Sequence, residues 1–371
     1  MNSYKKSKNE KVDLDNIKSV FFVSRIFELI DKTKKFEIIK YNKKIQKKLN
    51  LSFKDYKEYF NYLRYDTPIE IEIIPKYRIN RCFINIPSIG LDWKRIHIYF
   101  DDKKEEIFRY YFTAQDANVK KIKIIIDPEL KMLNSLFRRC NTIESISFKR
   151  FSRINIVSMS YLFFQCESLK KIDFSHFKTD NVENMENMFA GCTSLKELDL
   201  SNFKANNVEN MGYMFDTCTS LEKINFSNYN TNNVNLMQRM FYCCFSLKEL
   251  NFSSFNTKKV MFMHEMFFNC RSLKELNLSN FKINTNCRID SMFHGCKSLI
   301  KLDISHFNVN FNINNMLTLI EDFFFDCSLL KELYIPNLDN YNQEIKIGRI
   351  FNGCSEELKK KIKEKFPNLF D

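Results

Sequence analysis

The residues with the greatest potential for chemistry in this chain are its twelve cysteines, because thiolates bind zinc and oxidise to disulfides. A structural zinc site needs four ligands that converge on one ion. Nine of the cysteines instead recur once per repeat, next to Phe and Leu. We therefore expect small core residues rather than disulfides or metal ligands, and we predict no metal and no cofactor. The first seven of the nine are equally spaced, and the last two follow after slightly longer steps: Cys140, Cys166, Cys192, Cys218, Cys244, Cys270, Cys296, Cys327 and Cys354.

The five histidines do not form a recognisable catalytic motif. His176 and His306 share one repeat position five units apart, which is too far for the two side chains to act together if adjacent strands lie about 4.8 Å apart. The chain has no H-E-x-x-H, no G-x-S-x-G and no phosphate-binding loop. We predict that the protein is not an enzyme, and residues 66–120 are the only region where an unrecognised site could lie.

The elements that position the cysteines repeat with the same period as the cysteines themselves. A Phe precedes each of the nine cysteines by three positions, and an insertion within 308–316 explains the long step from Cys296 to Cys327. In each unit, alternation such as that of Leu198 and Leu200 predicts a short strand with one buried face. An Asn such as Asn207 then precedes an apolar stripe and is expected to be a helix N-cap. The stripe is typical of one helix face: Val208, Met211, Met214, Phe215 and Cys218.

This order of elements predicts an α/β fold, a leucine-rich-repeat solenoid with parallel strands on the concave face and helices on the convex face. The unit M-F-x-x-C-x-S-L-K-E-L-x-L-S-N-F also resembles the BspA-like leucine-rich repeats of bacterial and protist surface proteins. The resemblance covers roughly residues 121–354 and implies a recognition surface. The pattern is clearest at Met188–Phe203, Met214–Tyr229, Met240–Phe255, Met266–Phe281 and Met292–Phe307.

The chain divides by pattern into five regions. We predict a polar tail (1–15), a basic helical region (16–65), a β-rich N-terminal cap (66–120), the solenoid (121–354) and a capping helix (355–371). Within the cap, 95–100 and 106–112 predict a hairpin, and Lys120–Asp127 predicts the first solenoid strand. The run Ile26–Asp31, with Phe36, Ile39 and Asn42 after it, resembles an F-box, which implies recruitment of a ubiquitin-ligase scaffold. A plain helical cap is the other interpretation.

Charge is distributed unevenly along the chain. The formal net charge is +13, and residues 1–65 hold 17 Lys/Arg against 8 Asp/Glu, which leaves +9 in that region. A basic end favours an acidic partner, nucleic acid or an anionic membrane, or is a solvated helical face. No run reaches the 18 apolar residues of a membrane span, and Val20–Ile30 is a poor signal-peptide core because it contains Arg25 and Glu28. We therefore expect a cytoplasmic protein, with cell-surface export by another route as the alternative.

Two surfaces are candidates for binding a partner. The first consists of outward-facing strand positions, which carry both signs of charge and suit a protein or peptide better than a polyanion. These residues are Lys171, Asp173, Glu197, Asp199, Lys223, Asn225, Glu249, Asn251, Glu275, Asn277, Lys301 and Asp303. The second is an apolar patch at positions that are polar in other units, expected on or near the convex helices. It comprises Leu236, Tyr242, Phe245, Met261, Phe262 and Phe268.

The sequence favours a non-catalytic scaffold for protein–protein recognition, which we expect to be a monomer. An F-box-like ubiquitin-ligase adaptor and a surface adhesin of the BspA-like type are the alternatives. We consider a nucleic-acid partner less favoured, because the basic charge lies in one terminal region and not along the repeats.

Overall fold

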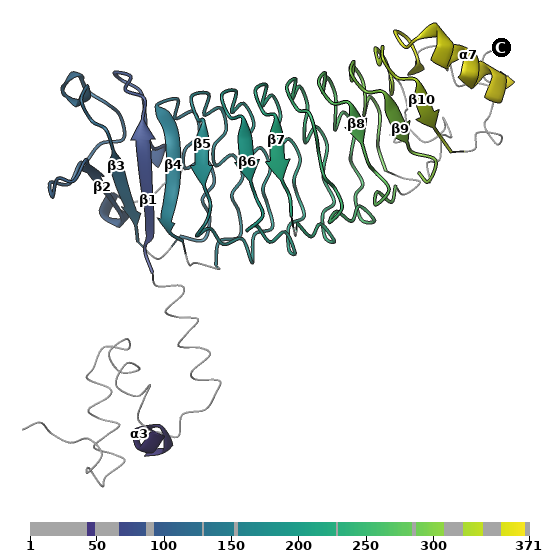
Figure 1. Cartoon of the computed structure of the whole chain (residues 1–371). Coiled ribbons are helices and arrows are strands. Elements are labelled where there is room, and N and C mark those ends of the chain that lie inside the picture. The colour runs from purple at the N-terminus through teal and green to yellow at the C-terminus, as the bar shows by residue number, and fades with distance from the viewer. Residues whose placement is uncertain are drawn as a thin grey trace, which may run out of the picture. The chain divides into compact units, whose positions relative to one another are not determined.

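The computed structural model describes residues 43–48, 67–86, 93–127, 130–151, 155–227, 229–283, 287–307, 322–336 and 350–367 (Figure 1). The chain divides into two compact units, Met1–Asp66 and Thr67–Asp371. In the first unit the described element is the helix α3 (Lys43–Lys48), which lies inside the basic helical region expected at 16–65. The other helices expected within 16–65, the F-box-like run and the insertion at 308–316 lie outside the described residues.

An antiparallel group of strands opens the second unit. Strands β1 (Ile69–Pro75), β2 (Ile96–Phe100) and β3 (Ile122–Ile126) lie in the order β2-β3-β1, and β1 pairs on its other side with β4 (Ile143–Arg150). Isoleucine stands at alternate positions on the buried face of β1, β2 and β3, as Ile69, Ile71 and Ile73 do in β1. The expectation that 120–127 forms the first parallel repeat strand was wrong, because β3 lies antiparallel between β2 and β1.

The expected hairpin is present only in part. Its first arm is β2, but the second arm contributes a single bridge between Tyr99 and Glu106, supported by the hydrogen bond from the N–H of Ile107 to the carbonyl of Ile98 at 2.7 Å. The β2 strand makes its full set of pairings with β3 instead. The segment 82–86 lies against the first repeat, where Phe83 and Ile84 are fully buried.

From β4 onwards the pairing is parallel. Strand β5 (Lys171–Asp173) joins β4, and β6 (Glu197–Asp199) pairs with β7 (Lys223–Asn225). Strands β8 (Glu275–Leu276), β9 (Lys301–Asp303) and β10 (Glu332–Tyr334) form a third sheet. Paired residues such as Asp199 and Asn225 are 26 positions apart, so successive units lie side by side (Figure 1). The described strands thus form three separate sheets of five, two and three strands.

The predicted fold class was wrong. The leucine-rich-repeat solenoid with a helical convex face requires a helix in every unit, whereas the described residues contain ten short strands in small separate sheets and two α-helices, α3 and α7 (Glu356–Lys365). The stripe from Val208 to Cys218 is buried as expected, but its backbone runs through successive tight turns. Tyr213 and Thr217 adopt left-handed φ values of 60° and 56°, which a right-handed helix excludes.

Hydrogen bonds between units explain why these segments are not helical. In a helix each N–H bonds to a carbonyl four residues earlier in the same segment. Here the N–H groups of Met211 and Phe215 donate to carbonyls of Leu236 and Met240 in the next unit, both at 2.9 Å. Tyr213 likewise donates to the carbonyl of Gln238 at 2.8 Å, whereas the N–H groups of Met214 and Cys218 close short turns within the unit, with the carbonyls of Met211 at 3.3 Å and Phe215 at 3.1 Å. We call each such segment a turn ribbon, defined by 208–218 and its equivalents.

The expected N-cap asparagines also have a different role. The side-chain amide of Asn207 donates to the carbonyl of Asp180 at 2.8 Å, and that of Asn233 donates to the carbonyl of Asn206 at 2.6 Å. Each Asn therefore links its unit to the preceding one and caps no helix. The sequence signal was real, because Asn is favoured wherever a side chain must replace backbone pairing at a turn.

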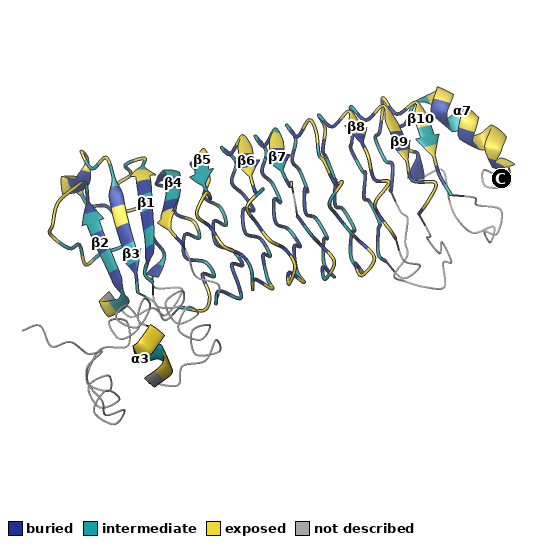
Figure 2. Cartoon of the chain, turned by 60° about the horizontal axis from the view of Figure 1, so that its bottom comes forward, coloured by how far each residue is buried: buried dark blue, intermediate teal, exposed yellow. Residues whose placement is uncertain are grey.

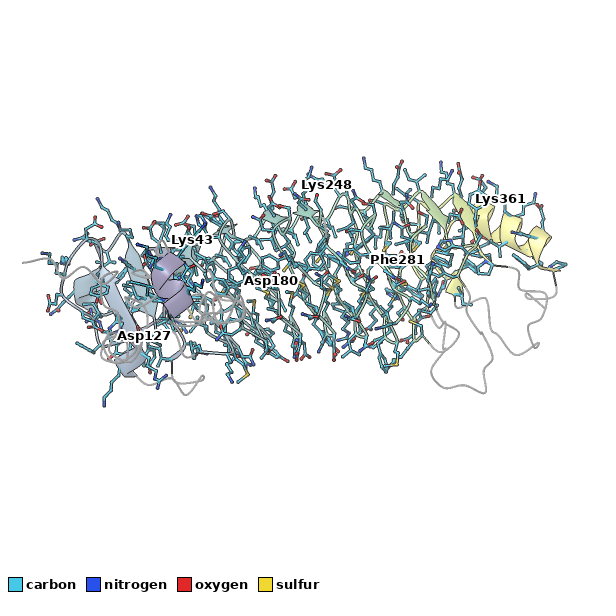
Figure 3. All side chains as sticks on the ribbon, turned by 90° about the horizontal axis from the view of Figure 1, so that it is seen from below. Lys43, Asp127, Asp180, Lys248, Phe281 and Lys361 are labelled. Atoms are coloured by element: carbon cyan, nitrogen blue, oxygen red, sulfur yellow. The ribbon has the colours of Figure 1, made fainter. Side chains whose placement is uncertain are left out.

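Stacked aromatic rings form the centre of the repeats. Phe189 and Phe215 are fully buried, with parallel rings whose centroids are 5.4 Å apart. The same contact continues in both directions, from Phe137 to Phe351, with neighbouring centroids 5.4–5.8 Å apart. Figure 3 shows Phe281 inside the body of the repeat units and Lys248 at its edge. A single unit cannot bury these rings, so stability depends on contacts between neighbouring units.

The helix α7 covers the last repeat. Ser355 caps it by accepting a hydrogen bond from the N–H of Leu358 at 3.2 Å, and Leu358, Ile362 and Phe366 are buried, as the sequence predicts. Lysine and glutamate occupy the opposite face, which is exposed to solvent (Figure 2).

Candidate recognition surfaces

The outward strand positions form two rows, which together we call the strand face. In one row the side-chain oxygen of each Asp or Asn accepts a hydrogen bond from the N–H two residues later. For example, Asp199 accepts from Ser201 at 2.9 Å. This is an Asx turn, which ends each strand and directs the chain into the next turn. Six units repeat it, at Asp173, Asp199, Asn225, Asn251, Asn277 and Asp303, with distances of 2.9–3.0 Å.

The other row of the strand face carries charges that pair with each other. Lys223 and Glu249 are 2.8 Å apart across neighbouring units, and Lys301 lies 3.0 Å from Glu332. These groups are well exposed, so water screens each pair and its contribution to stability is small. Glu197 and Glu275 are exposed on β6 and β8. The strand face therefore presents balanced charge and offers no one-signed track for a polyanion.

Shallow hollows mark the strand face at three places. One, of about 500 Å³, lies over β4 and β5 between Glu72, Lys171 and Asp199. Two others, of about 640 and 660 Å³, lie on either side of the partly exposed Leu250. Glu249 and Leu250 line both of them. In all three, the lining combines the Asx-turn residues with aliphatic residues from the strands, so this surface offers polar contacts on a shallow apolar floor.

The apolar patch lies on the turn ribbons, and not on convex helices as expected. Tyr242 and Phe268 stack with ring centroids 4.7 Å apart. Leu236 and Phe262 are bridged backbone partners in adjacent units, and Met261 is 51% exposed. Phe245 is half-buried, and the guanidinium of Arg271 lies 4.5 Å from its ring centroid. The structure thus pairs four of the six residues across neighbouring ribbons, Tyr242 with Phe268 and Leu236 with Phe262.

The structure extends the stacked pair into a longer column. The ring of His294 lies 4.2 Å from that of Phe268, and Phe325 continues the stack 4.7 Å further on. We call Tyr242, Phe268, His294 and Phe325 the aromatic column. All four are half-buried. His294 and Phe325 escaped the sequence analysis, although His294 lies exactly one repeat after Phe268, which was an available signal.

Charged and polar side chains border the aromatic column. Arg239 forms an ion pair with Glu265, and its guanidinium lies 4.8 Å from the centroid of Tyr242. Arg288 pairs with Asp290 at 2.6 Å. Three buried atoms nearby have no hydrogen-bond partner among the described residues: Gln238 Oε1, His264 Nδ1 and His294 Nδ1. Because these atoms are themselves buried, a partner could reach them only if the side chains around them moved, and the accessible part of this surface is the half-exposed rings.

Burial controls the charge of the titratable groups beside the column. It lowers the pKa of both His264 and His294, so their rings are neutral at pH 7. Asp216 occupies the column position one unit before Tyr242, and burial raises the pKa of its carboxyl to about 6, against the opposing charge of Arg239. The neutral rings favour aromatic contacts, whereas the Asp216 carboxyl is still mostly ionised at pH 7 and becomes neutral below about pH 6.

A buried charged pair in the region 66–120 has a structural role. Arg109 lies 2.6 Å from Asp116, whose other oxygen accepts from the backbone N–H of Thr113 at 2.6 Å. Although burial opposes it, these hydrogen bonds hold the pKa of Asp116 below its usual range. The carboxylate therefore fixes the 3₁₀ turn η3 (Ala114–Asp116) that leads into β3.

The repeated cysteines are buried, as the sequence predicts, and they also make a hydrogen bond that it did not reveal. Each of the eight repeat cysteines after Cys140 donates its thiol to the carbonyl of a Phe in an earlier unit, as Cys218 does to Phe189 at 3.1 Å. Burial raises the pKa of Cys218 to about 12, so this thiol stays protonated and unreactive. All twelve cysteines are free thiols.

Two findings bear on metals and membranes. In the part of the chain that the structure describes, no group of three or more His, Cys, Asp or Glu side chains is placed to hold a metal ion. Over the same residues, no helix has the length and apolar character needed to cross a bilayer.

The stacked units, the turn ribbons and the buried stack of Phe rings define a repeat protein, in which equivalent residues such as Asp199 and Asn225 lie 26 positions apart. The chain belongs to the family described as "Mycoplasma protein of unknown function, DUF285", whose model matches residues 131–250 and 219–332, more than half of the chain. No curated protein matches the sequence. The family match does not test the resemblance to BspA-like repeats, which stays a prediction.

Proposed function

We propose that this chain is a non-catalytic recognition protein that binds a protein or peptide partner through the aromatic column. The observation that carries the proposal is the stack of four half-exposed rings on neighbouring turn ribbons. Aromatic and arginine side chains dominate the binding energy of protein interfaces. Arg239 and Arg288 supply charged groups at the border, each held in place by an acidic neighbour.

The strand face supports a recognition role less well. Its Asp and Asn side chains already accept hydrogen bonds from their own turns, and two of its lysines pair with neighbouring glutamates. A partner would have to compete with these contacts. The rings of the aromatic column are half-exposed, and a partner can contact their exposed parts without breaking an Asx turn or a strand-face ion pair.

Other units of the repeat show which substitutions the column position tolerates. The column position is occupied by Ala190 in one unit and by Asp216 in another, so a turn ribbon accommodates a small side chain there. The Tyr242→Ala/Phe268→Ala double variant is therefore expected to fold. A matched control exchanges charge on the strand face, Lys223→Glu/Glu249→Lys, which keeps the ion pair in reversed order.

Partners are captured from native cells with the unmodified chain and both variants, identified by mass spectrometry, purified and titrated by calorimetry. We expect the column variant to weaken binding at least about tenfold, since loss of one anchoring aromatic residue costs about 2 kcal/mol. The strand-face variant should bind like the unmodified chain. If the strand-face variant alone loses the partner, recognition lies on the strands and the proposal is wrong.

A further inference from the structure

The first cysteine of the repeat series breaks the rule that the others follow. The thiol of each later cysteine donates to a Phe carbonyl in an earlier unit, at 2.9–3.2 Å. Cys140 begins the series, so no earlier unit supplies that carbonyl. A second thiol faces it instead, because Cys82 Sγ lies 3.6 Å from Cys140 Sγ.

The segment that carries Cys82 takes the place of a preceding unit. The N–H of Asn85 donates to the carbonyl of Leu136 at 2.8 Å, and its side-chain amide donates to the carbonyl of Ser135 at 3.1 Å. The hydroxyl of Thr142 donates to the carbonyl of Cys82 at 2.7 Å. These contacts hold segment 82–86 against the first unit and fix the two sulfur atoms in register.

The two thiols differ in access and in acidity. Cys140 is fully buried, whereas Cys82 is partly exposed. The hydrogen bond from the Cys140 thiol, assisted by the charge of Arg81, lowers the pKa of Cys82 to about 7, while burial raises the pKa of Cys140. Cys82 is therefore the thiol that a reagent can reach and that ionises near neutral pH, which is optimal for thiol–disulfide exchange.

We propose that Cys82 and Cys140 are a redox modification site, at which a small-molecule disulfide converts the two thiols into one intramolecular disulfide. The Cys82 thiolate attacks the reagent RSSR, forms a mixed disulfide and releases one thiolate RS⁻. Cys140 then loses its proton and attacks Cys82 Sγ, which releases the second RS⁻. Both thiolates take up the protons that the cysteines lost, so two protein thiols and RSSR give one protein disulfide and two RSH.

Only a short movement separates the thiols from the bonded state. The sulfur atoms must approach from 3.6 Å to a bond length of about 2.05 Å. The bond would join segment 82–86 covalently to the first repeat, 58 positions later in the chain. It would thereby fasten the N-terminal end of the stack, since terminal repeats have a neighbour on one side only.

The test uses the full-length chain, reduced and freed of reductant, then incubated with oxidised glutathione. After denaturation in acid, one sample is examined by intact mass without alkylation, and in a second sample the free thiols are alkylated before intact mass and peptide mapping. We expect two fewer alkylated cysteines, a mass loss of two hydrogen atoms relative to the reduced chain, and one cross-linked peptide that joins Cys82 to Cys140. Cys140→Ser should instead retain glutathione on Cys82, because no thiol resolves the mixed disulfide.

Cys243→Ser is the matched control. Cys243 is also partly exposed, but its Sγ faces the side-chain amide of Asn269 at 3.8 Å, so this variant should form the Cys82–Cys140 bond like the unmodified chain. A thermal melt of the oxidised and reduced unmodified chain supplies a readout without any variant, and oxidation should raise the midpoint. The proposal is overturned if glutathione stays on Cys82 in the unmodified chain, if Cys82 pairs with another cysteine, or if neither residue is modified.

Discussion

The effect of replacing Gly191 by Ala on stability distinguishes a turn ribbon from the helix that the sequence predicts for the same segment. Gly191 has a left-handed φ of +76°, and an added Cβ would lie 3.0 Å from Gln165 Cγ and 3.2 Å from Gln165 Cα. A side chain in the left-handed region costs about 1–2 kcal/mol. The reduced freedom of the unfolded chain returns about 0.4–1 kcal/mol. With the crowding against Gln165, the expected net loss of stability is about 1 kcal/mol.

A helix would give the opposite sign. In a helix interior, Ala is more favourable than Gly by about 0.8–1.0 kcal/mol, so the same variant would be more stable. The two backbones therefore differ by about 2 kcal/mol in the effect of one methyl group, which a urea titration followed by circular dichroism resolves easily.

Gly212→Ala is the control. Its φ is not left-handed, and the atom nearest to its added Cβ is the terminal Nε2 of the flexible Gln238 side chain. We expect its urea midpoint to change by less than half as much as that of Gly191→Ala. A midpoint for Gly191→Ala that rises, or that merely matches Gly212→Ala, would refute the left-handed turn and with it the ribbon.

Three further predictions concern charge and turns. Burial raises the pKa of Asp216 to about 6, so protonated Asp216 favours the folded chain at low pH, and this contribution is lost as pH rises through the folded pKa. Asp216→Asn should therefore match the unmodified chain near pH 4 and be more stable than it at pH 7 by about 1–2 kcal/mol, after allowance for partial exposure. Equal stabilities of the two chains in chemical denaturation at both pH values would contradict this. Asp199→Ala should destabilise the chain by about 1 kcal/mol, because it removes the side-chain acceptor of an Asx turn. Asp199→Asn keeps an acceptor oxygen and should leave the free energy of unfolding unchanged in the same assay. Equal losses of stability in the two variants would show that the turn does not depend on this oxygen. Burial lowers the pKa of His97, but the hydrogen bond with Glu106 and the charges of Glu106 and Asp127 outweigh it and raise the pKa. The His97–Glu106 ion pair therefore stabilises the fold at low pH and weakens as pH rises through the folded pKa. Thermal midpoints of the unmodified chain and Glu106→Gln should differ most near pH 5 and converge towards pH 8, and a difference that stays constant with pH would contradict this.

The sequence predicted the features that depend on one unit at a time. The length of the repeat, the strand around Leu198 and the burial of Phe215 and Cys218 were all visible in the pattern. The helix α7 was visible too, because its apolar spacing and its Ser cap are local signals. The Asx turns had a signal that the interpretation missed, namely Asp or Asn two residues before Ser in successive units, as in Asp199 and Ser201.

The sequence identified some residues of the aromatic column and missed others. Tyr242 and Phe268 stood out as apolar residues in polar positions, and the structure stacks them. His294 was not noticed, because a histidine does not interrupt a polar pattern. Its spacing of 26 residues from Phe268 was an available signal, whereas its contact with Phe325, 31 residues later, follows only from the stacking of units.

What the sequence by itself determined is the repeat: its length, its buried positions and its strands, since these follow from residue type and spacing within one unit. What only the tertiary structure decided is the backbone of the stripe from Val208 to Cys218. A helix and a chain of tight turns bury residues at similar intervals of three and four, so the apolar pattern fits both. The choice depends on whether each N–H finds its carbonyl in the same unit or in the next one, as Met211 does at Leu236. Stacking supplies that partner, and a single unit cannot encode it.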